Sequence, residues 1–136
     1  MLYGAECWVI GKKEEGILEA TEMRMLRRIK GVTLRDKCRS KDIRKVLNIK
    51  DIKEKVKEIR LCWYGHIQRM EDNNPVKQTM EMVVPGKRPR GRPRGRWKDR
   101  IQGDMQTLRI TPEDAYDRKF WKSRIKAANP TKWETA

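Results

Sequence analysis

The sequence has few of the residues that usually form a disulfide framework, a membrane span or a secretion signal. Cys7, Cys38 and Cys62 are odd in number and widely separated, which argues against disulfides and favours a reducing compartment. No apolar run approaches the roughly 18 residues of a membrane span. The first residues also lack the charged and apolar regions of a signal peptide. We therefore expect an intracellular protein, nuclear or cytoplasmic, that contacts no membrane.

Recognisable catalytic motifs are also missing. The sequence has no Gly-x-Ser-x-Gly, no phosphate-binding glycine loop and no pairing of a nucleophile with its single histidine. Its aspartates are spread out, whereas two-metal phosphoryl chemistry needs carboxylates gathered around the ions. Cys62 and His66 lie one helical turn apart, but the other cysteines lack zinc-site spacing. We predict no catalytic residue, no metal and no cofactor for this chain alone, and a packing role for His66.

Positive charge is abundant and lies in two blocks. The formal net charge is +15, with 34 Lys and Arg against 19 Asp and Glu. Residues 24–45 carry ten basic and two acidic residues, and residues 87–100 carry eight basic and one acidic residue. Solvated surfaces usually mix both signs, so two blocks of one sign favour an anionic partner. The first block supplies Arg24, Arg27, Arg28, Lys30, Arg35, Lys37 and Arg39 as candidate phosphate contacts.

The second block alternates arginine with proline and glycine. Such a segment cannot be a helix and is poorly suited to a central strand. It is predicted to be an extended ribbon whose guanidinium groups meet a phosphate backbone. Its candidate contacts are Lys87, Arg88, Arg90, Arg92, Arg94 and Arg96.

Apolar spacing predicts a mainly α fold. A short strand or extended arm is expected over 2–10, and helices are expected over 12–30, 41–47 (capped by Ser40), about 52–70, 97–108 and about 112–128. Residues 76–85 are compatible with either a helix or a strand. We divide the chain into a helical region (1–75), a linker with the basic ribbon (76–96), and a C-terminal helical pair with a loose tail (97–136).

Aromatic residues are expected to support this arrangement. Trp63 and Trp121 occupy apolar helical faces and are predicted to be core residues, and Phe120 and Ile125 are predicted to point inward beside Trp121. Trp97 directly follows the ribbon, so it either anchors the ribbon to the fold or stacks on a base. Anchoring is the favoured role. Trp63 and His66 are expected to support their helix between the two basic surfaces.

Five segments in order resemble the C-terminal end of an endonuclease–reverse transcriptase of LINE-type (non-LTR) retrotransposons. The first, Leu-Tyr-Gly-Ala-Glu-Cys-Trp at 2–8, resembles the LYGxExW segment just beyond the polymerase palm. The others are residues 22–28, residues 60–70 (Arg-Leu-Cys-Trp-Tyr-Gly-His-Ile-Gln-Arg-Met), Gly91–Arg94 with Arg96 and Trp97, and Asp117–Arg118 with Trp121. The resemblance runs over essentially all of the chain, and the order of five segments is more specific than any one of them.

The resemblance implies a function without catalysis. The family's Tyr-x-Asp-Asp motif and its nuclease do not occur in this sequence. What is present resembles the thumb and basic C-terminal region, which grip template RNA, target DNA or an RNA–DNA hybrid, with the palm and endonuclease portions of the parent polyprotein as further partners. Two residues depart from the family pattern: Cys62 stands where an Arg is usual, and Arg109 where a Gly often follows Leu.

Two other hypotheses remain open. Pro89-Arg90-Gly91-Arg92-Pro93 resembles the core of an AT-hook, in which Arg-Gly-Arg lies in the narrow minor groove of A·T-rich DNA. This pattern would make the chain an architectural DNA-binding protein. Alternatively, the ribbon serves as a nuclear import signal of an interaction module that binds nucleic acid only weakly.

Overall fold

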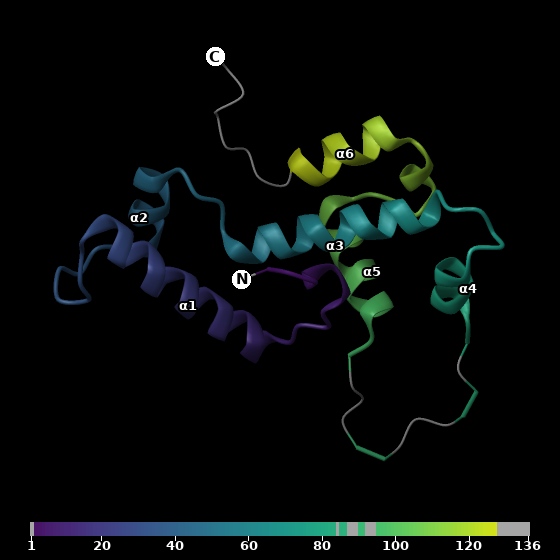
Figure 1. The fold of residues 1–136 in the computed structure, drawn as a ribbon, viewed down its shortest axis with the longest axis horizontal. Helices are drawn as coiled ribbons and strands as arrows, with labels where there is room; N and C mark the ends of the chain where they lie inside the picture. Colours follow the sequence, from purple (N-terminus) through teal and green to yellow (C-terminus); the bar gives the residue numbers. More distant parts are fainter. Residues whose placement is uncertain (1, 84, 87–89, 92–94, 128–136) are drawn as a thin grey trace.

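A computed structural model describes residues 2–83, 85–86, 90–91 and 95–127. This part of the chain is mainly helical and contains no strand (Figure 1). In chain order, the elements are the 3₁₀ turn η1 (Ala5–Cys7), α1 (Lys12–Lys30), α2 (Ser40–Leu47), α3 (Ile52–Gln68), α4 (Pro75–Glu81), α5 (Trp97–Leu108), η2 (Glu113–Tyr116) and α6 (Arg118–Ala127). No helix among these residues is long and apolar enough to cross a membrane.

The predicted start and stop signals explain the longer helices. Glu14 accepts a hydrogen bond from the backbone N–H of Gly11 at 3.0 Å, which satisfies a free donor at the start of α1. Gly31 ends α1 with φ 72°, a left-handed conformation that glycine adopts without steric cost. Asp51 caps α3 by accepting from the N–H of Lys53 at 3.0 Å. The predicted bounds of the helices over 12–30 and 97–108 are confirmed.

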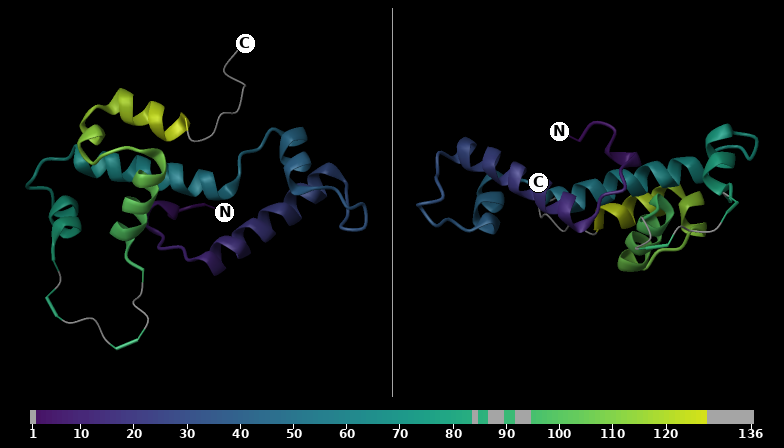
Figure 2. Two further views of the ribbon diagram at one scale, coloured as in Figure 1. Left: turned by 180° about the vertical axis from the view of Figure 1, so that it is seen from behind. Right: turned by 90° about the horizontal axis from the view of Figure 1, so that it is seen from below.

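Helix α3 is the central element of an elongated molecule (Figures 1 and 2). The α1–α2 pair lies at one end of α3, while α4, α5 and α6 gather around its other half. Met23, Leu26 and Ile43 are buried between α1 and α2. Ile10, Ile52 and Val56 form a second small cluster where the N-terminal segment meets α3.

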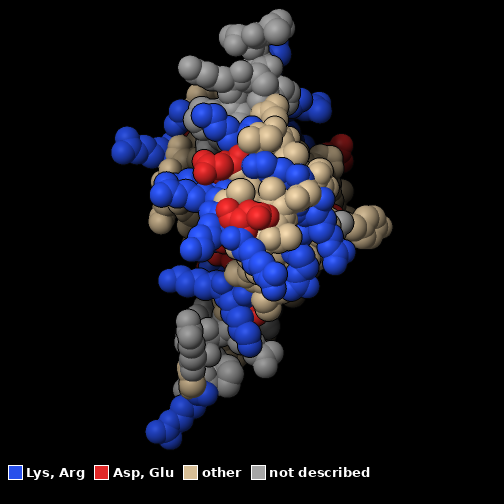
Figure 3. All heavy atoms as spheres, turned by 90° about the vertical axis from the view of Figure 1, so that its left-hand side faces the viewer, with Lys and Arg blue, Asp and Glu red and all other residues tan. Residues whose placement is uncertain are grey.

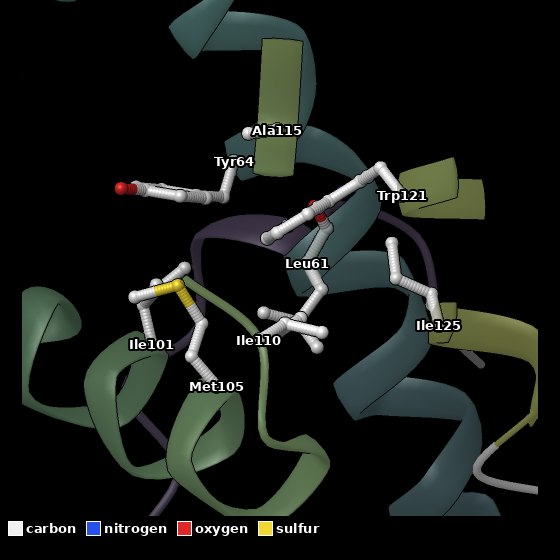
Figure 4. Close-up of a cluster of buried hydrophobic side chains, with 8 residues drawn as sticks. All are labelled: Leu61, Tyr64, Ile101, Met105, Ile110, Ala115, Trp121 and Ile125. Atoms are coloured by element: carbon white, nitrogen blue, oxygen red, sulfur yellow. The ribbon is translucent and has the colours of Figure 1, made fainter. Parts of the chain in front are cut away.

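The largest core cluster joins α3 to the C-terminal helices (Figure 4). Leu61 and Tyr64 of α3 meet residues of α5, α6 and the segment between them; the other members are Ile101, Met105, Ile110, Ala115, Trp121 and Ile125. The indole Nε1 of Trp121 donates to the carbonyl of Leu61 at 3.0 Å. This core draws residues from both sides of the basic ribbon, so the two predicted helical regions share it. The predicted division of the chain stays a prediction.

A buried ion pair also joins α3 to α5, and the sequence analysis did not predict it. Arg60 donates to a carboxylate oxygen of Asp104 from Nε at 2.8 Å and from Nη2 at 2.5 Å. The Arg60 side chain is only 7 % exposed. Because these residues are 44 positions apart, only the packing of the two helices brings them together.

The predicted N-terminal strand is wrong. Residues 2–10 form an irregular segment around η1, and Leu2, Trp8 and Ile10 pack into the cluster with Ile52 and Val56. A strand needs a partner for its backbone groups, and the described part of the chain offers none. Leu2, Trp8 and Ile10 thus contribute to the core without forming a strand.

Two helix predictions also need correction. The helix expected over about 112–128 is interrupted at Asp117, which has ψ 99°. The Asp117 carboxylate accepts from the N–H groups of Lys119 and Phe120, at 2.9 and 3.1 Å, and so starts α6 anew. This restart leaves Phe120 44 % exposed rather than inward. In α2, Ser40 is the first helical residue, and Arg39 takes the capping position without a side-chain hydrogen bond.

Candidate nucleic-acid interface

The first predicted basic surface is formed by the end of α1 and the loop that leads to α2. Arg24, Arg28, Arg35, Lys37 and Arg39 are exposed, and Arg27 and Lys30 are half-buried. Arg24, Arg27 and Arg28 share one side of α1 because they are spaced by three and four residues. Figure 3 looks at this end of the molecule and shows Lys and Arg spread over it with few acidic side chains.

Three acidic residues near this surface, Glu19, Glu22 and Asp51, pair with other basic residues. Arg44 of α2 lies between Glu22 of α1 at 2.6 Å and Asp51 before α3 at 3.1 Å, which ties three helices together. Lys53 forms an ion pair with Glu19, with an N···O distance of 2.7 Å. None of the seven predicted residues of the first surface forms an ion pair with a carboxylate of the described residues. Their positive charge is therefore available to an outside anion.

The second predicted surface is described only in part. Lys87, Arg88, Arg92 and Arg94 lie outside the described residues. Arg90 and Arg96 are exposed, and neither residue lies in a helix. Gly91 has φ 122°, a conformation that a residue with a side chain rarely adopts. The helices α4 and α5, which flank this segment, lie on the other side of the molecule from α2 (Figure 1). A ligand that touches both basic surfaces must therefore be extended.

Trp97, the first residue of α5, directly follows the basic ribbon and contacts two other elements of the fold. Its Nε1 donates to the carbonyl of Glu6 at 2.8 Å, and its ring lies 6.5 Å from that of Tyr64. Both contacts fasten the first turn of α5, and with it the end of the ribbon, to η1 and α3. This geometry agrees with anchoring, the role favoured for Trp97.

The other aromatic predictions have mixed outcomes. Trp121 is 2 % exposed and belongs to the core, as predicted. Trp63 is only half-buried and His66 is exposed, so the predicted core roles of these two residues are wrong. Their rings lie 5.4 Å apart, and neither residue belongs to the buried core clusters. The reason is that α5 and α6 pack against the neighbouring face of α3, where Leu61 and Tyr64 lie.

A groove that the sequence did not predict lies between α3 and α6. It has a volume of about 700 Å³. Its walls include Trp63 and His66 from α3 and the basic residues Arg118, Lys122 and Lys126 from α6. Spacing by four residues places these three on one side of α6, and this pattern was a readable signal in the sequence. The groove adds a third concentration of positive charge to the two that were predicted.

Two carboxyl groups with shifted pKa values, Asp72 and Asp104, each contact a basic side chain of the fold. The hydrogen bond from Lys77 lowers the pKa of Asp72, at an N···O distance of 2.6 Å. Lys77 is buried and also donates to the carbonyl of Met70 just beyond α3. Burial raises the pKa of Asp104, and the hydrogen bonds from Arg60 oppose this effect. Within the described ranges, no three His, Cys, Asp or Glu side chains gather closely enough to hold a metal ion.

Comparison with curated proteins links the chain to a transposon-derived protein. The chain is 32% identical, over 93% of its length, to a Caenorhabditis elegans protein named "putative uncharacterized transposon-derived protein". The chain spans about half the length of this curated relative (50%). No protein family and no solved structure matches the chain. The chain is thus similar over nearly all of its length to a protein whose name gives it a transposon origin.

Proposed function

We propose that this chain is a noncatalytic, nucleic-acid-binding C-terminal part of a LINE-type reverse transcriptase. The observation that carries the proposal is the row of exposed Arg and Lys on α1 and the following loop, which have no carboxylate partner among the described residues. Uncompensated positive charge of this density attracts a polyanion. Without such a partner it lowers the stability of the folded chain, because like charges repel in the compact state. The basic ribbon between α4 and α5 would supply a second set of phosphate contacts.

The transposon link supports the family part of this proposal. The relative's name supplies the transposon origin, and the five ordered segments resemble LINE-type reverse transcriptases in particular. Two of these segments meet in the fold, because Trp97 donates to the carbonyl of Glu6 within the Leu-Tyr-Gly-Ala-Glu-Cys-Trp segment. The palm and endonuclease of such a protein would carry the chemistry, while this part would hold template RNA or target DNA.

The proposal is tested by the salt dependence of binding. If about five phosphates are neutralised, the logarithm of the association constant for duplex DNA should fall against the logarithm of salt concentration with a slope of about −4.5. Fluorescence anisotropy of the full chain would be measured at several salt concentrations. The ligands would be an A·T-rich duplex, a G·C-rich duplex, an RNA hairpin and an RNA–DNA hybrid. Similar steep slopes for all four, or tighter binding of the hybrid, support the proposal, and salt-insensitive binding refutes it.

A matched pair of variants locates the surface. Arg24→Ala with Arg28→Ala removes two charges from the end of α1 and should make the slope shallower by roughly 2. Lys12→Ala with Lys13→Ala removes two exposed charges from the other end of the same helix. If the second pair weakens binding as much as the first, net charge rather than this surface determines binding.

An AT-hook-like architectural role is the second candidate, favoured by the conformation of Gly91. Arg90 is exposed beside Gly91, whose φ of 122° needs the absence of a side chain. An Arg-Gly-Arg of this kind can approach the floor of a narrow minor groove. This role predicts a clear preference for A·T-rich duplex that Arg90→Ala with Arg92→Ala abolishes. Equal affinity for A·T-rich and G·C-rich duplexes would exclude it.

A further inference from the structure

The groove between α3 and α6 has one aromatic wall and one basic wall. The aromatic wall consists of the half-buried Trp63 and the exposed His66, with ring centroids 5.4 Å apart. The basic wall is the row formed by Arg118, Lys122 and Lys126, all exposed. The indole of Trp121 and the side chain of Ile125 also line the groove and are otherwise buried in the core.

The described residues that line the groove carry a net positive charge, and the ion pairs among them leave the basic residues of α6 uncompensated. Its lining residues include the acids Glu6 and Glu58. Glu58 already pairs with Lys50 at 3.7 Å and with Lys55 at 3.5 Å. Among the described residues, no carboxylate pairs with the three basic residues on α6. The groove therefore offers a row of cations, unpaired among the described residues, opposite the half-buried Trp63 and the exposed His66.

This combination matches the chemistry of an unpaired nucleotide. Proteins that bind single strands combine a positive groove, which follows the backbone, with aromatic side chains on which bases stack. A base in a duplex offers no free face for such stacking. The groove volume of about 700 Å³ also lies in the range of roughly 300–1,000 Å³ that encloses a small organic ligand, the size class of one or two nucleotides.

We propose that the α3–α6 groove binds the unpaired nucleotides of a single strand, with a base on the Trp63–His66 pair and the backbone phosphates along Arg118, Lys122 and Lys126. This site is distinct from the two basic surfaces, which would hold a duplex or a hybrid by its phosphates alone. The proposal rests on the proposed function because it takes the chain's natural ligand to be a nucleic acid. It adds a place for the single-stranded portion of a ligand with both paired and unpaired segments.

The test compares the full chain and its variants on a fluorescein-labelled oligo(dT) 12-mer and on a blunt duplex of the same length. Lys122→Glu reverses a charge inside the groove. Lys119→Glu makes the same change at an exposed residue of α6 that does not line the groove. We expect Lys122→Glu to weaken oligo(dT) binding at least fivefold more than Lys119→Glu, while both variants bind the duplex alike.

A second pair of variants tests the aromatic wall. Trp63→Leu should weaken oligo(dT) binding about 5- to 150-fold, the loss that accompanies one stacked base. Trp63→Tyr keeps an aromatic face and should restore most of the affinity. Thermal unfolding by circular dichroism separates this effect from misfolding, and His66→Ala, at an exposed position, gives a milder loss that does not depend on packing.

The outcomes separate the groove from the proposed function. If the chain binds duplex and hybrid steeply with salt but Lys122→Glu and Lys119→Glu act alike on oligo(dT), the groove proposal fails and the proposed function stands. If the chain binds no nucleic acid, both fail. If a poly-glutamate peptide of equal charge displaces oligo(dT) at the same concentration, the groove recognises charge alone, and the proposed single-strand site is refuted.

Discussion

Gly65 is the position where one methyl group should disturb both the core and the α3–α6 groove. It is buried on α3, and a Cβ placed there would lie 2.4 Å from Nε1 and 2.8 Å from Cδ1 of Trp121. The indole cannot simply turn aside, because it is 2 % exposed and its Nε1 donates to the carbonyl of Leu61 at 3.0 Å. Gly65→Ala must therefore displace Trp121, and with it the start of α6.

The expected magnitude follows from three terms. Overpacking of a filled core costs about 1–3 kcal/mol. Loss of the hydrogen bond from Trp121 to Leu61 costs about 1 kcal/mol. Replacing a glycine inside a helix by alanine returns about 1 kcal/mol. The free energy of unfolding should thus fall by roughly 1–3 kcal/mol.

Urea unfolding followed by far-ultraviolet circular dichroism measures this change. Gly103→Ala is the matched control, because Gly103 is an exposed glycine of α5 whose added Cβ would meet nothing within 4 Å. There the helix preference acts alone and should raise the free energy of unfolding by about 0.5–1 kcal/mol. The two identical substitutions are therefore predicted to have opposite signs.

A Gly65→Ala variant as stable as Gly103→Ala would refute the close packing of Trp121 on α3. The variant should also weaken oligo(dT) binding, because Trp121 lines the groove. Unchanged oligo(dT) affinity together with a large loss of stability would show that the core and the groove are independent, contrary to the arrangement described above.

Two further predictions concern stability. Asp104→Ala should lower the free energy of unfolding by about 3–5 kcal/mol, because it leaves the buried guanidinium of Arg60 without its partner. In urea unfolding, the double variant Arg60→Met with Asp104→Leu should recover most of this loss. If it does not, the broken ion pair is not the cause of the loss. Arg109→Gly should raise the free energy of unfolding by about 0.5–1 kcal/mol, because Arg109 ends α5 at φ 54° and ψ 48°, where a Cβ is strained. Arg109→Ala, which keeps the Cβ, is its control and should show no such gain.

Much of the helical structure could be predicted because its signals are local. The acid at position 14, the glycine at position 31 and the Asp51 cap act on neighbouring backbone groups, so α1 and α3 begin or end where these residues predict. Arg109 illustrates the same logic: at the position where the resemblance to LINE-type reverse transcriptases leads one to expect glycine, α5 ends in the left-handed conformation. The strand expected over 2–10 failed because a strand depends on a partner elsewhere in the chain.

The candidate site, like the fold, was predicted only where its signals are local in the sequence. Charge blocks and the Pro-Gly-Arg ribbon are properties of composition, and the first block identified seven basic residues of α1 and the following loop, of which five are exposed. The roles of Trp63 and His66 were misassigned because apolar spacing identifies a stripe on α3 but not the side on which α5 and α6 pack.

The sequence by itself determined the mainly helical class, the limits of the longest helices and the excess of positive charge in two blocks, because each follows from residues close together in the chain. Only the tertiary structure decided that Arg60 meets Asp104, that Trp121 fills the space beside Gly65, and that α6 places its basic row opposite Trp63 and His66. These contacts join residues some 40 to 60 positions apart. They depend on how helices pack against one another, which side-chain volume and shape complementarity determine over the whole core.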